Sequence, residues 1–164
     1  GDLGEWTAAS HLKLTGRKSE VFKTSTGRKI APTAVEARLK QISGIDHVVV
    51  FGAARKAIVA LVTPSAELLP ALVDDAAFAR YAQQIAAQTA AMTADDAAYL
   101  RPAGLLVHRH AFTIDAGELT SNLKLRRKTI EARHQAALDA LFVRLESGGQ
   151  FLNPAAPDTL MLNC

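Results

Sequence analysis

The sequence predicts an α+β fold, in which a small central sheet is covered by helices and preceded by a β-hairpin arm. Three observations favour this class. Residues 48–51 and 57–62 are nearly continuous apolar runs, as expected of strands that are buried on both faces. Segments that begin at Pro32 and Leu125 repeat apolar residues every three or four positions, as amphipathic helices do. Two short apolar segments flank a glycine turn at residues 24–27, which indicates the hairpin.

The first part of the chain predicts two small β elements and one helix. Residues 12–14 alternate apolar and polar side chains, which indicates a short strand, and residues 15–17 form a turn. Residues 21–30 form the hairpin arm. Pro32 fits the first position of a helix that Gly44 ends. The apolar positions of this helix are Val35, Leu39 and Ile42.

The rest of the chain predicts the core. The two apolar runs are joined through residues 52–56 and form a buried hairpin. An Ala-rich helix covers residues 76–98, and residues 105–107 form a third core strand. The last helix begins near Leu125 and continues to Gly148. The segment after it holds two prolines and few charges, so we expect a loosely ordered tail at its end.

Composition limits the function classes. The chain has 164 residues, of which 49% are hydrophobic and 21% charged, so it can form one real core and is not a disordered tail or a fibre. The formal charge is only +3. Residues 1–40 nevertheless hold eight Lys or Arg against four acids, and residues 101–164 hold eight against six. If the fold brings these segments together, they form one anion-facing surface, and phosphate is the commonest such anion.

The sequence also indicates the compartment. The single cysteine, Cys164, rules out an intrachain disulfide, and a reducing cytoplasm is the simpler expectation. The sequence contains neither a run of about 18 apolar residues nor the pattern of a signal peptide at its start. We therefore expect a soluble, cytoplasmic protein. Because the sequence starts at Gly1 rather than Met, we also expect a fragment of a longer enzyme.

Two stretches carry recognisable chemistry. The first contains GDLG at residues 1–4, LKLTGR at 12–17, and GRKIAP at 27–32, followed by Val35-Glu36. The second, GELTSNLKLRR, covers residues 117–127. In this order and at this spacing they resemble the carboxy-terminal part of the acyl-adenylate-forming family, most closely the long-chain fatty acyl-CoA synthetases. The resemblance covers roughly residues 1 to 142.

The resemblance implies an activity and a domain organisation. The parent enzyme would convert a fatty acid and ATP to acyl-adenylate and pyrophosphate, and then transfer the acyl group to CoA with release of AMP. Residues 1–18 would end the large amino-terminal adenylating domain, residues 19–146 would form the small lid domain, and residues 147–164 the tail. The large domain would be the lid's partner and would hold most of the ATP, CoA and Mg²⁺ contacts. Peripheral membrane association of the parent stays open.

The resemblance assigns the catalytic role to Lys124. Adenylation brings a carboxylate against the α-phosphate of ATP, so a cation is needed where these two anions meet. A lysine ammonium on its long stem can reach into a site that is formed mainly by another domain. The alternative is a solvated lysine in a basic segment that also contains Arg126, Arg127 and Lys128.

Four further residues receive roles from the resemblance. Asp2 would accept hydrogen bonds from the ribose hydroxyls, and Arg17 would contact the nucleotide near its ribose and phosphate. Ser19 stands at the hinge between the domains, where many members carry Lys or Asp. Gly27 would face the pantetheine channel, because the absent side chain lets the backbone approach a ligand. Read without the resemblance, Asp2 is a frayed terminus, Arg17 a surface turn residue and Gly27 an ordinary turn glycine.

The same residues allow two alternative functions, an acyl-AMP ligase and a nucleic-acid-binding module. A fatty acyl-AMP ligase that delivers the adenylate to a carrier protein shares these motifs. A stand-alone basic module for nucleic acid would have aromatic residues interleaved with its basic ones, and this chain lacks them, so we expect no nucleic-acid partner. His108 and His110 form a His-x-His pattern without a third ligand nearby in the sequence, so we expect no metal site there.

Overall fold

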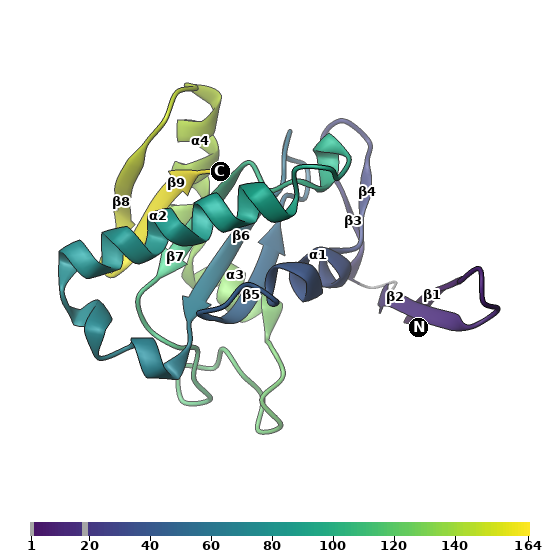
Figure 1. Ribbon diagram of the computed structural model, residues 1–164, viewed down its shortest axis with the longest axis horizontal. Coiled ribbons are helices and arrows are strands. Elements are labelled where there is room, and N and C mark those ends of the chain that lie inside the picture. Colours follow the sequence, from purple (N-terminus) through teal and green to yellow (C-terminus); the bar gives the residue numbers. More distant parts are fainter. Residues whose placement is uncertain (1, 18–19) are drawn as a thin grey trace.

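A five-stranded sheet forms the centre of the molecule (Figure 1). The computed structural model describes residues 2–17 and 20–164, and the side chains of all of these except residues 2–3 and 13–17. The strand order is β5-β6-β7-β9-β8, with β6 and β7 parallel and the other neighbours antiparallel. The strands are β5 (Ile45–Phe51), β6 (Val59–Pro64), β7 (Gly104–His108), β8 (Leu152–Ala156) and β9 (Thr159–Asn163).

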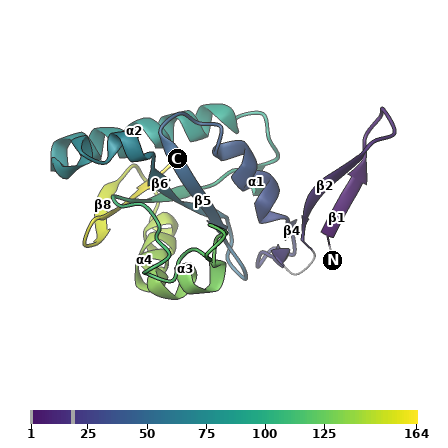
Figure 2. The ribbon, with the colours of Figure 1, turned by 90° about the horizontal axis from the view of Figure 1, so that it is seen from below.

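Helices cover both faces of this sheet, which confirms the predicted α+β class (Figure 2). They are α1 (Pro32–Leu39) and α2 (Asp75–Met92) on one face, and α3 (Arg127–Arg133) and α4 (Gln135–Glu146) on the other. Side chains alternate along a strand, so Val48 and Val50 enter the hydrophobic cluster on the first face. Val49 and Phe51 enter the cluster on the second. This double cover explains why the core strands are continuous apolar runs.

Local signals set the ends of the long helices. The Asp74 side chain caps the start of α2 by accepting a hydrogen bond from the Ala77 backbone nitrogen at 2.8 Å. The helix ends at Met92 rather than at the predicted residue 98. The carbonyl of Met92, at the end of the helix, accepts a hydrogen bond from the Arg38 guanidinium at 2.7 Å. The predicted last helix is divided at His134 into α3 and α4.

Two small hairpins precede the central sheet. They are β1 (Asp2–Trp6) with β2 (Leu12–Arg17), and β3 (Phe22–Lys23) with β4 (Lys29–Ile30). The second confirms the predicted arm at residues 21–30. The structure also describes 3-10 helices at Ala66–Leu68, Ala71–Val73 and Ala98–Leu100. Among the described residues, no helix combines the length and the hydropathy that crossing a lipid bilayer requires.

The carboxy-terminal segment differs from its prediction as a loosely ordered tail. Strands β8 and β9 belong to the central sheet, and β9 lies between β7 and β8. Met161 and Leu162 are buried, one in each hydrophobic cluster. The prediction is wrong because the strand partner of β9 lies about fifty residues earlier in the chain, and local composition carries no information about such a pairing.

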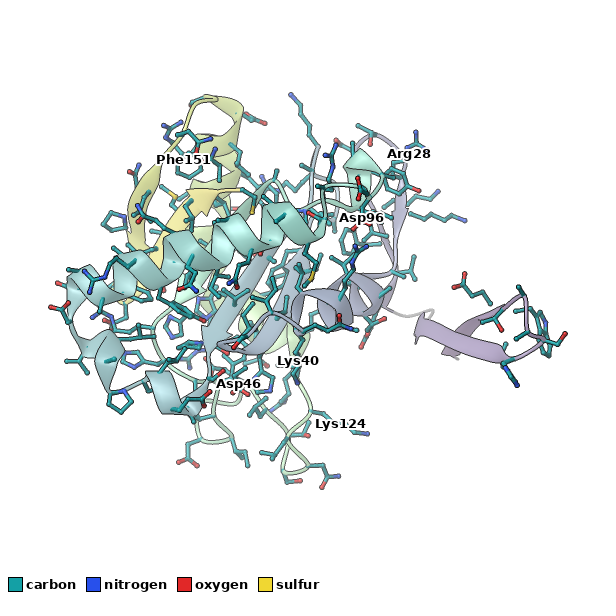
Figure 3. The ribbon with its side chains drawn as sticks, viewed as in Figure 1. Arg28, Lys40, Asp46, Asp96, Lys124 and Phe151 are labelled. Carbon is teal, nitrogen blue, oxygen red and sulfur yellow. The ribbon has the colours of Figure 1, made fainter. Side chains whose placement is uncertain are left out.

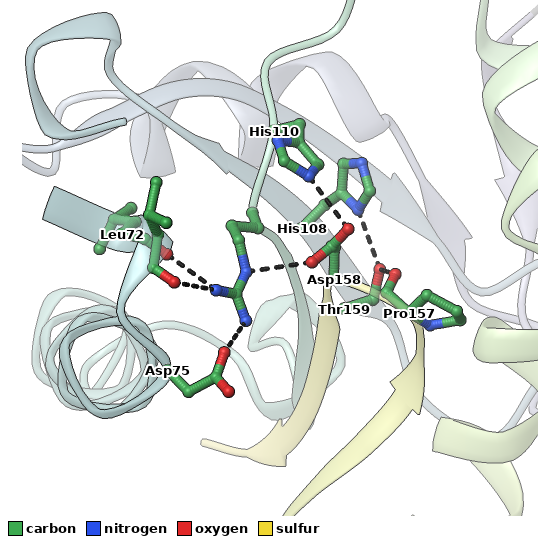
Figure 4. Close-up of polar contacts among 9 residues, drawn as sticks. Leu72, Asp75, His108, His110, Pro157, Asp158 and Thr159 are labelled. Atoms are coloured by element: carbon green, nitrogen blue, oxygen red, sulfur yellow. Dashed lines mark hydrogen bonds and ion pairs between the residues drawn. The ribbon is translucent and has the colours of Figure 1, made fainter. Parts of the chain in front are cut away.

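Polar contacts from the end of β7 hold the turn between β8 and β9 (Figure 4). The Nε of Arg109 lies 3.2 Å from Asp158 Oδ1, and its guanidinium also stacks over the ring of Phe78 at 4.5 Å. The same guanidinium donates to the carbonyls of Leu72 and Val73 and to Asp75 Oδ1.

Two histidines at the end of β7 also contact this turn. His108 Nδ1 and Thr159 Oγ1 are 2.9 Å apart, and His110 Nε2 lies 3.1 Å from Asp158 Oδ2. These bonds tie the carboxy-terminal hairpin to both β7 and α2.

Candidate functional site

Lys124 lies on a short, closed loop between β7 and α3. Leu119 and Leu125 pair as an antiparallel bridge, and the Arg126 nitrogen donates to the Glu118 carbonyl at 2.8 Å. The loop therefore leaves the domain and returns to it at the same place. The Lys124 side chain is exposed, has no interaction partner among the described residues, and points away from the domain (Figure 3).

The base of this loop is anchored in the core. Glu118 is only 5% exposed, and its carboxylate accepts a hydrogen bond from the Thr113 nitrogen at 3.0 Å. The other carboxylate oxygen lies 3.4 Å from Arg133 Nε on α3. Leu119 is buried in the second hydrophobic cluster. A buried carboxylate needs such partners, because an unpaired charge in the interior is costly. The loop base is thus held by both polar and apolar contacts.

The basic segment around Lys124 is not uniform. Arg127 forms a two-pronged ion pair with Glu36 of α1, at 2.6 and 3.0 Å, and also donates to the Val50 carbonyl at 3.2 Å. Glu36 Oε1 in turn accepts a hydrogen bond from the Val50 nitrogen at 2.8 Å. Arg127 is therefore a structural cation that joins α3, α1 and β5. In the described part of the chain, Lys124 and Lys128 have no such acid partner.

A groove of about 650 Å³ adjoins this segment. It is lined by residues 20–22, residues 50–53 and residues 125–131 apart from Ile130. Segments from both ends of the chain therefore meet here, and the exposed cations Arg126 and Lys128 lie on the groove's wall. The predicted anion-facing surface is realised only in part, because Arg28 and Lys124 lie at opposite ends of the domain (Figure 3).

Gly27 lies in the turn of the β3–β4 arm. Its φ is +84°, a left-handed conformation that favours glycine, and its nitrogen donates to the Thr24 carbonyl at 3.0 Å. A Cβ atom at this position would meet no atom within 4 Å, so the glycine faces open space. The neighbouring Arg28 guanidinium lies 4.8 Å from the centre of the Tyr99 ring. The turn can therefore be approached from outside without displacing the domain's own side chains.

The other predicted site residues lie at the edge of what the structure describes. Asp2 and Arg17 are backbone partners across the β1–β2 hairpin, so the structure brings these two positions together. Their side chains lie outside the described part of the chain, and so does the whole of Ser19. Glu20, the next residue, has its Oε2 4.0 Å from Arg127 Nη2. The chain therefore enters the domain that contains the central sheet close to the ion pair that holds α3.

Sequence reasoning missed the residues that support the Lys124 loop: Glu118, Thr120, and the pair Glu36 and Arg127. One signal was available. Glu36 follows Val35 on the buried side of α1. A carboxylate beside an apolar stripe needs a basic partner, because a buried unpaired charge is costly. Its partner could not be named, because Arg127 lies 91 residues later in the chain.

A histidine cluster lies between the sheet and α3. The ring of His108 is 5.0 Å from that of His134 and 5.6 Å from that of His110. Burial, together with the charges of His134 and His110, lowers the pKa of His108 from 6.5 to about 4. In the described ranges, no group of three or more His, Cys, Asp or Glu side chains is arranged to hold a metal ion.

Comparison with known proteins identifies the class. The family model of AMP-binding enzyme C-terminal domains matches residues 20–146, so the chain belongs to this family of adenylate-forming enzymes. Long-chain-fatty-acid–CoA ligase FadD15 of Mycobacterium tuberculosis is 30% identical over 87% of the chain and 26% of its own length. Human long-chain-fatty-acid–CoA ligase 1 is 26% identical over 87% of the chain and 22% of its own length. The chain thus spans about a quarter of the curated relatives it matches.

A solved structure has the same fold. The A-PCP didomain of a carboxylic acid reductase from Segniliparus rugosus, determined in complex with AMP, matches with a TM-score of 0.73 and 24% sequence identity. The match covers 90% of this chain and 21% of that one. This match shows the fold, and the family model shows the class, the C-terminal domain of an adenylate-forming enzyme.

Proposed function

We propose that this chain is the carboxy-terminal lid of an ATP-dependent long-chain fatty acid–CoA ligase. Residues 1–18 end the large adenylating domain, and residues 19–146 form the lid together with the β8–β9 hairpin, which belongs to the same central sheet. The parent enzyme joins a fatty acid to ATP to give acyl-adenylate and pyrophosphate, and CoA then takes the acyl group with release of AMP. The observation that carries this proposal is Lys124, an exposed ammonium that has no acid partner among the described residues and lies on a loop anchored in the core.

Lys124 serves the first half-reaction. Negative charge concentrates where the substrate carboxylate attacks the α-phosphate, and a positioned cation stabilises that charge in the transition state. Arg127 cannot take this role, because its guanidinium is already bound to Glu36. The long lysine stem lets the ammonium enter a site that the large domain completes.

Gly27 serves the second half-reaction. The lid turns about Ser19 and presents the β3–β4 turn to the thiol of the acceptor, so that each half-reaction uses a different face of one domain. The separation of Arg28 and Lys124 in Figure 3 supports this division of labour. Asp2 and Arg17 contact the ribose and the phosphate of the nucleotide. The large domain holds most of the contacts to ATP, CoA and Mg²⁺, and the enzyme acts in the cytoplasm.

A carrier protein is the second candidate acceptor. One curated relative, 25% identical over 87% of the chain, is a long-chain-fatty-acid–[acyl-carrier-protein] ligase of Arabidopsis thaliana. An acyl-AMP ligase of this kind would use the same lysine and would differ only in the thiol that approaches Gly27.

The decisive experiment measures AMP release by the enzyme that contains this chain. Purified enzyme is given ATP, Mg²⁺ and a long-chain fatty acid, and then either CoA or a phosphopantetheinylated carrier protein. We expect AMP release that depends on CoA. Release only with the carrier protein would establish the second candidate instead. The absence of pyrophosphate release with any fatty acid would refute both.

A further inference from the structure

The loop that carries Lys124 is organised around one residue, Thr120, through both its backbone and its side-chain hydroxyl. The Thr120 nitrogen donates to the Lys124 carbonyl at 2.8 Å, and the Lys124 nitrogen donates to the Thr120 hydroxyl oxygen at 3.1 Å. Both backbone polar groups of Lys124 therefore end on Thr120. The Thr120 carbonyl also accepts a hydrogen bond from the Leu123 nitrogen at 2.8 Å.

These bonds hold an unfavourable backbone conformation. Leu123, directly before the lysine, has a φ of +60°, and its side chain is 64% exposed. A leucine avoids this left-handed region, because its Cβ crowds the backbone. Such a residue persists only where its surroundings over-determine it, and these outliers gather at functional sites. Here the surroundings are the three hydrogen bonds to Thr120.

The direction of the Lys124 side chain depends on this turn. In the described part of the chain, no other side chain contacts the Lys124 ammonium, so its starting direction is set by its own backbone. The base of the loop is fixed by the buried Glu118 and Leu119. Between this base and the lysine, Thr120 supplies the only side-chain hydrogen bond to the turn among the described residues.

We propose that Thr120 is a positioning residue for the adenylation half-reaction, because its hydroxyl fixes the backbone from which Lys124 reaches the reacting phosphate. The inference rests on the proposed role of Lys124. A displacement of about 1 Å in a positioned group can cost up to about a hundredfold in rate, so a local change in this turn is sufficient to slow the reaction.

The test compares two substitutions in the enzyme that contains this chain. Thr120→Val keeps the shape of the side chain but removes the acceptor oxygen, whereas Thr120→Ser keeps the oxygen. We expect Thr120→Val to lower kcat for pyrophosphate release about tenfold, with little change in KM for ATP, and Thr120→Ser to restore most of it. Thioester formation from synthetic acyl-adenylate should be unchanged in both variants.

A spectroscopic measurement accompanies the kinetics. Amide hydrogen exchange at Lys124 should be faster in Thr120→Val than in the unaltered protein, because the amide loses its acceptor. In Thr120→Ser the exchange rate should return to that of the unaltered protein, because the acceptor oxygen is present again. Ser121→Ala is the matched control. It removes a hydroxyl one residue away for which the described structure has no hydrogen bond, and neither exchange nor rate should change.

The outcomes separate this inference from the proposed function. If Lys124→Ala slows adenylation but Thr120→Val does not, or if Thr120→Val slows both half-reactions equally, the positioning role is refuted and the lysine's role stands. Equal rates in Thr120→Val and Thr120→Ser refute it as well. If Lys124→Ala leaves adenylation unchanged, the proposed function fails, and the inference fails with it.

Discussion

Lys124 and its basic neighbour Arg127 differ in how their charges are paired. The Arg127 guanidinium donates hydrogen bonds to Glu36 and to the Val50 carbonyl, so it stabilises the fold. Among the described residues, Lys124 forms only the two hydrogen bonds of its own backbone nitrogen and carbonyl with Thr120. A solvated surface lysine would not need a closed loop with a buried acid at its base. The local structure therefore favours a functional role for this ammonium.

Lys124→Ala should slow adenylate formation by about 10² to 10³ in the enzyme that contains this chain, because it removes one preorganised charge from the transition state. Thioester formation from synthetic acyl-adenylate should be nearly unchanged. The measurement is pyrophosphate release in the first case and acyl-CoA formation in the second. Lys40→Ala is the matched control, since it removes the same charge from the exposed end of α1 (Figure 3). An equal loss in both half-reactions would contradict the assigned role.

Gly27→Leu should give the opposite pattern. The added side chain meets no atom of the domain, so it projects into the space through which the acceptor would approach. Thioester formation should fall on the order of tenfold or more, because the thiol can no longer reach its position, while pyrophosphate release stays the same. Gly27→Ala is the control, since it carries the same strain at a φ of +84° without the bulk. Similar thioester rates in the two variants would remove Gly27 from the acceptor path.

At the scale of elements, the carboxy-terminal hairpin is the part of the fold that sequence reasoning placed least well. The family match ends at residue 146, yet β8 and β9 extend the sheet beyond it. β9 pairs with β7 along five positions, and Arg109 ties the turn between β8 and β9 to α2. This hairpin is therefore a structural component of the domain.

Leu162→Ala tests that conclusion. The side chain is 3% exposed in the cluster beneath α2, so its truncation should lower the free energy of unfolding by about 2 to 5 kcal/mol. Denaturant unfolding of the 164-residue chain measures this. Val143→Ala, at a 65% exposed position on α4, should change stability by less than about 0.5 kcal/mol. A loss for Leu162→Ala as small as that of the control would show that the segment is not packed as described.

The histidines at the end of β7 should make stability depend on pH. Burial, with further contributions from His134, His110 and Arg133 against Asp158, lowers the pKa of His108 from 6.5 to about 4. Between these values the unfolded chain binds a proton that the folded chain does not. The free energy of unfolding is therefore at its full value above about pH 6.5 and falls as the pH is lowered toward 4.

His108→Gln should make this decrease shallower, because glutamine does not titrate. The pKa of His134 is also lowered by burial, so part of the pH dependence should persist in the variant. Denaturant unfolding at about pH 7 and about pH 5 gives the comparison. The ion pair of His110 with Asp158 acts in a different range, because the lowered pKa of Asp158 places its contribution at more acidic pH. Identical pH profiles for the two proteins would contradict the assignment to His108.

At the scale of the whole molecule, the two proposed functional surfaces lie on separate segments of one domain. The Lys124 loop leaves the domain near α3, and the Gly27 turn lies in the arm before α1. Neither surface encloses a substrate by itself. In the proposed function the domain acts by approaching a site on another domain, and this agrees with a chain that spans 26% of a 30% identical relative.

The isolated 164-residue chain should therefore fold but release no detectable pyrophosphate from ATP and a long-chain fatty acid. The acyl pocket and most nucleotide contacts belong, in the proposed function, to the large domain. A continuous pyrophosphate assay with the enzyme that contains this chain as positive control measures the difference. Release above the rate without protein would refute the assignment of this chain as a lid.

The sequence by itself determined most elements and the main candidate residues. Apolar runs and helical spacing reflect which side chains of an element are buried, on one face or on both. This pattern can be recognised within a short stretch of sequence. The motif spacing was sufficient to recognise the family and to single out Lys124 and Gly27. Only the tertiary structure decided what supports them. The pair Glu36 and Arg127 and the insertion of β9 beside β7 depend on contacts formed when the chain closes on itself. Partners that lie about 50 to 90 residues apart leave no periodic signal in a single sequence.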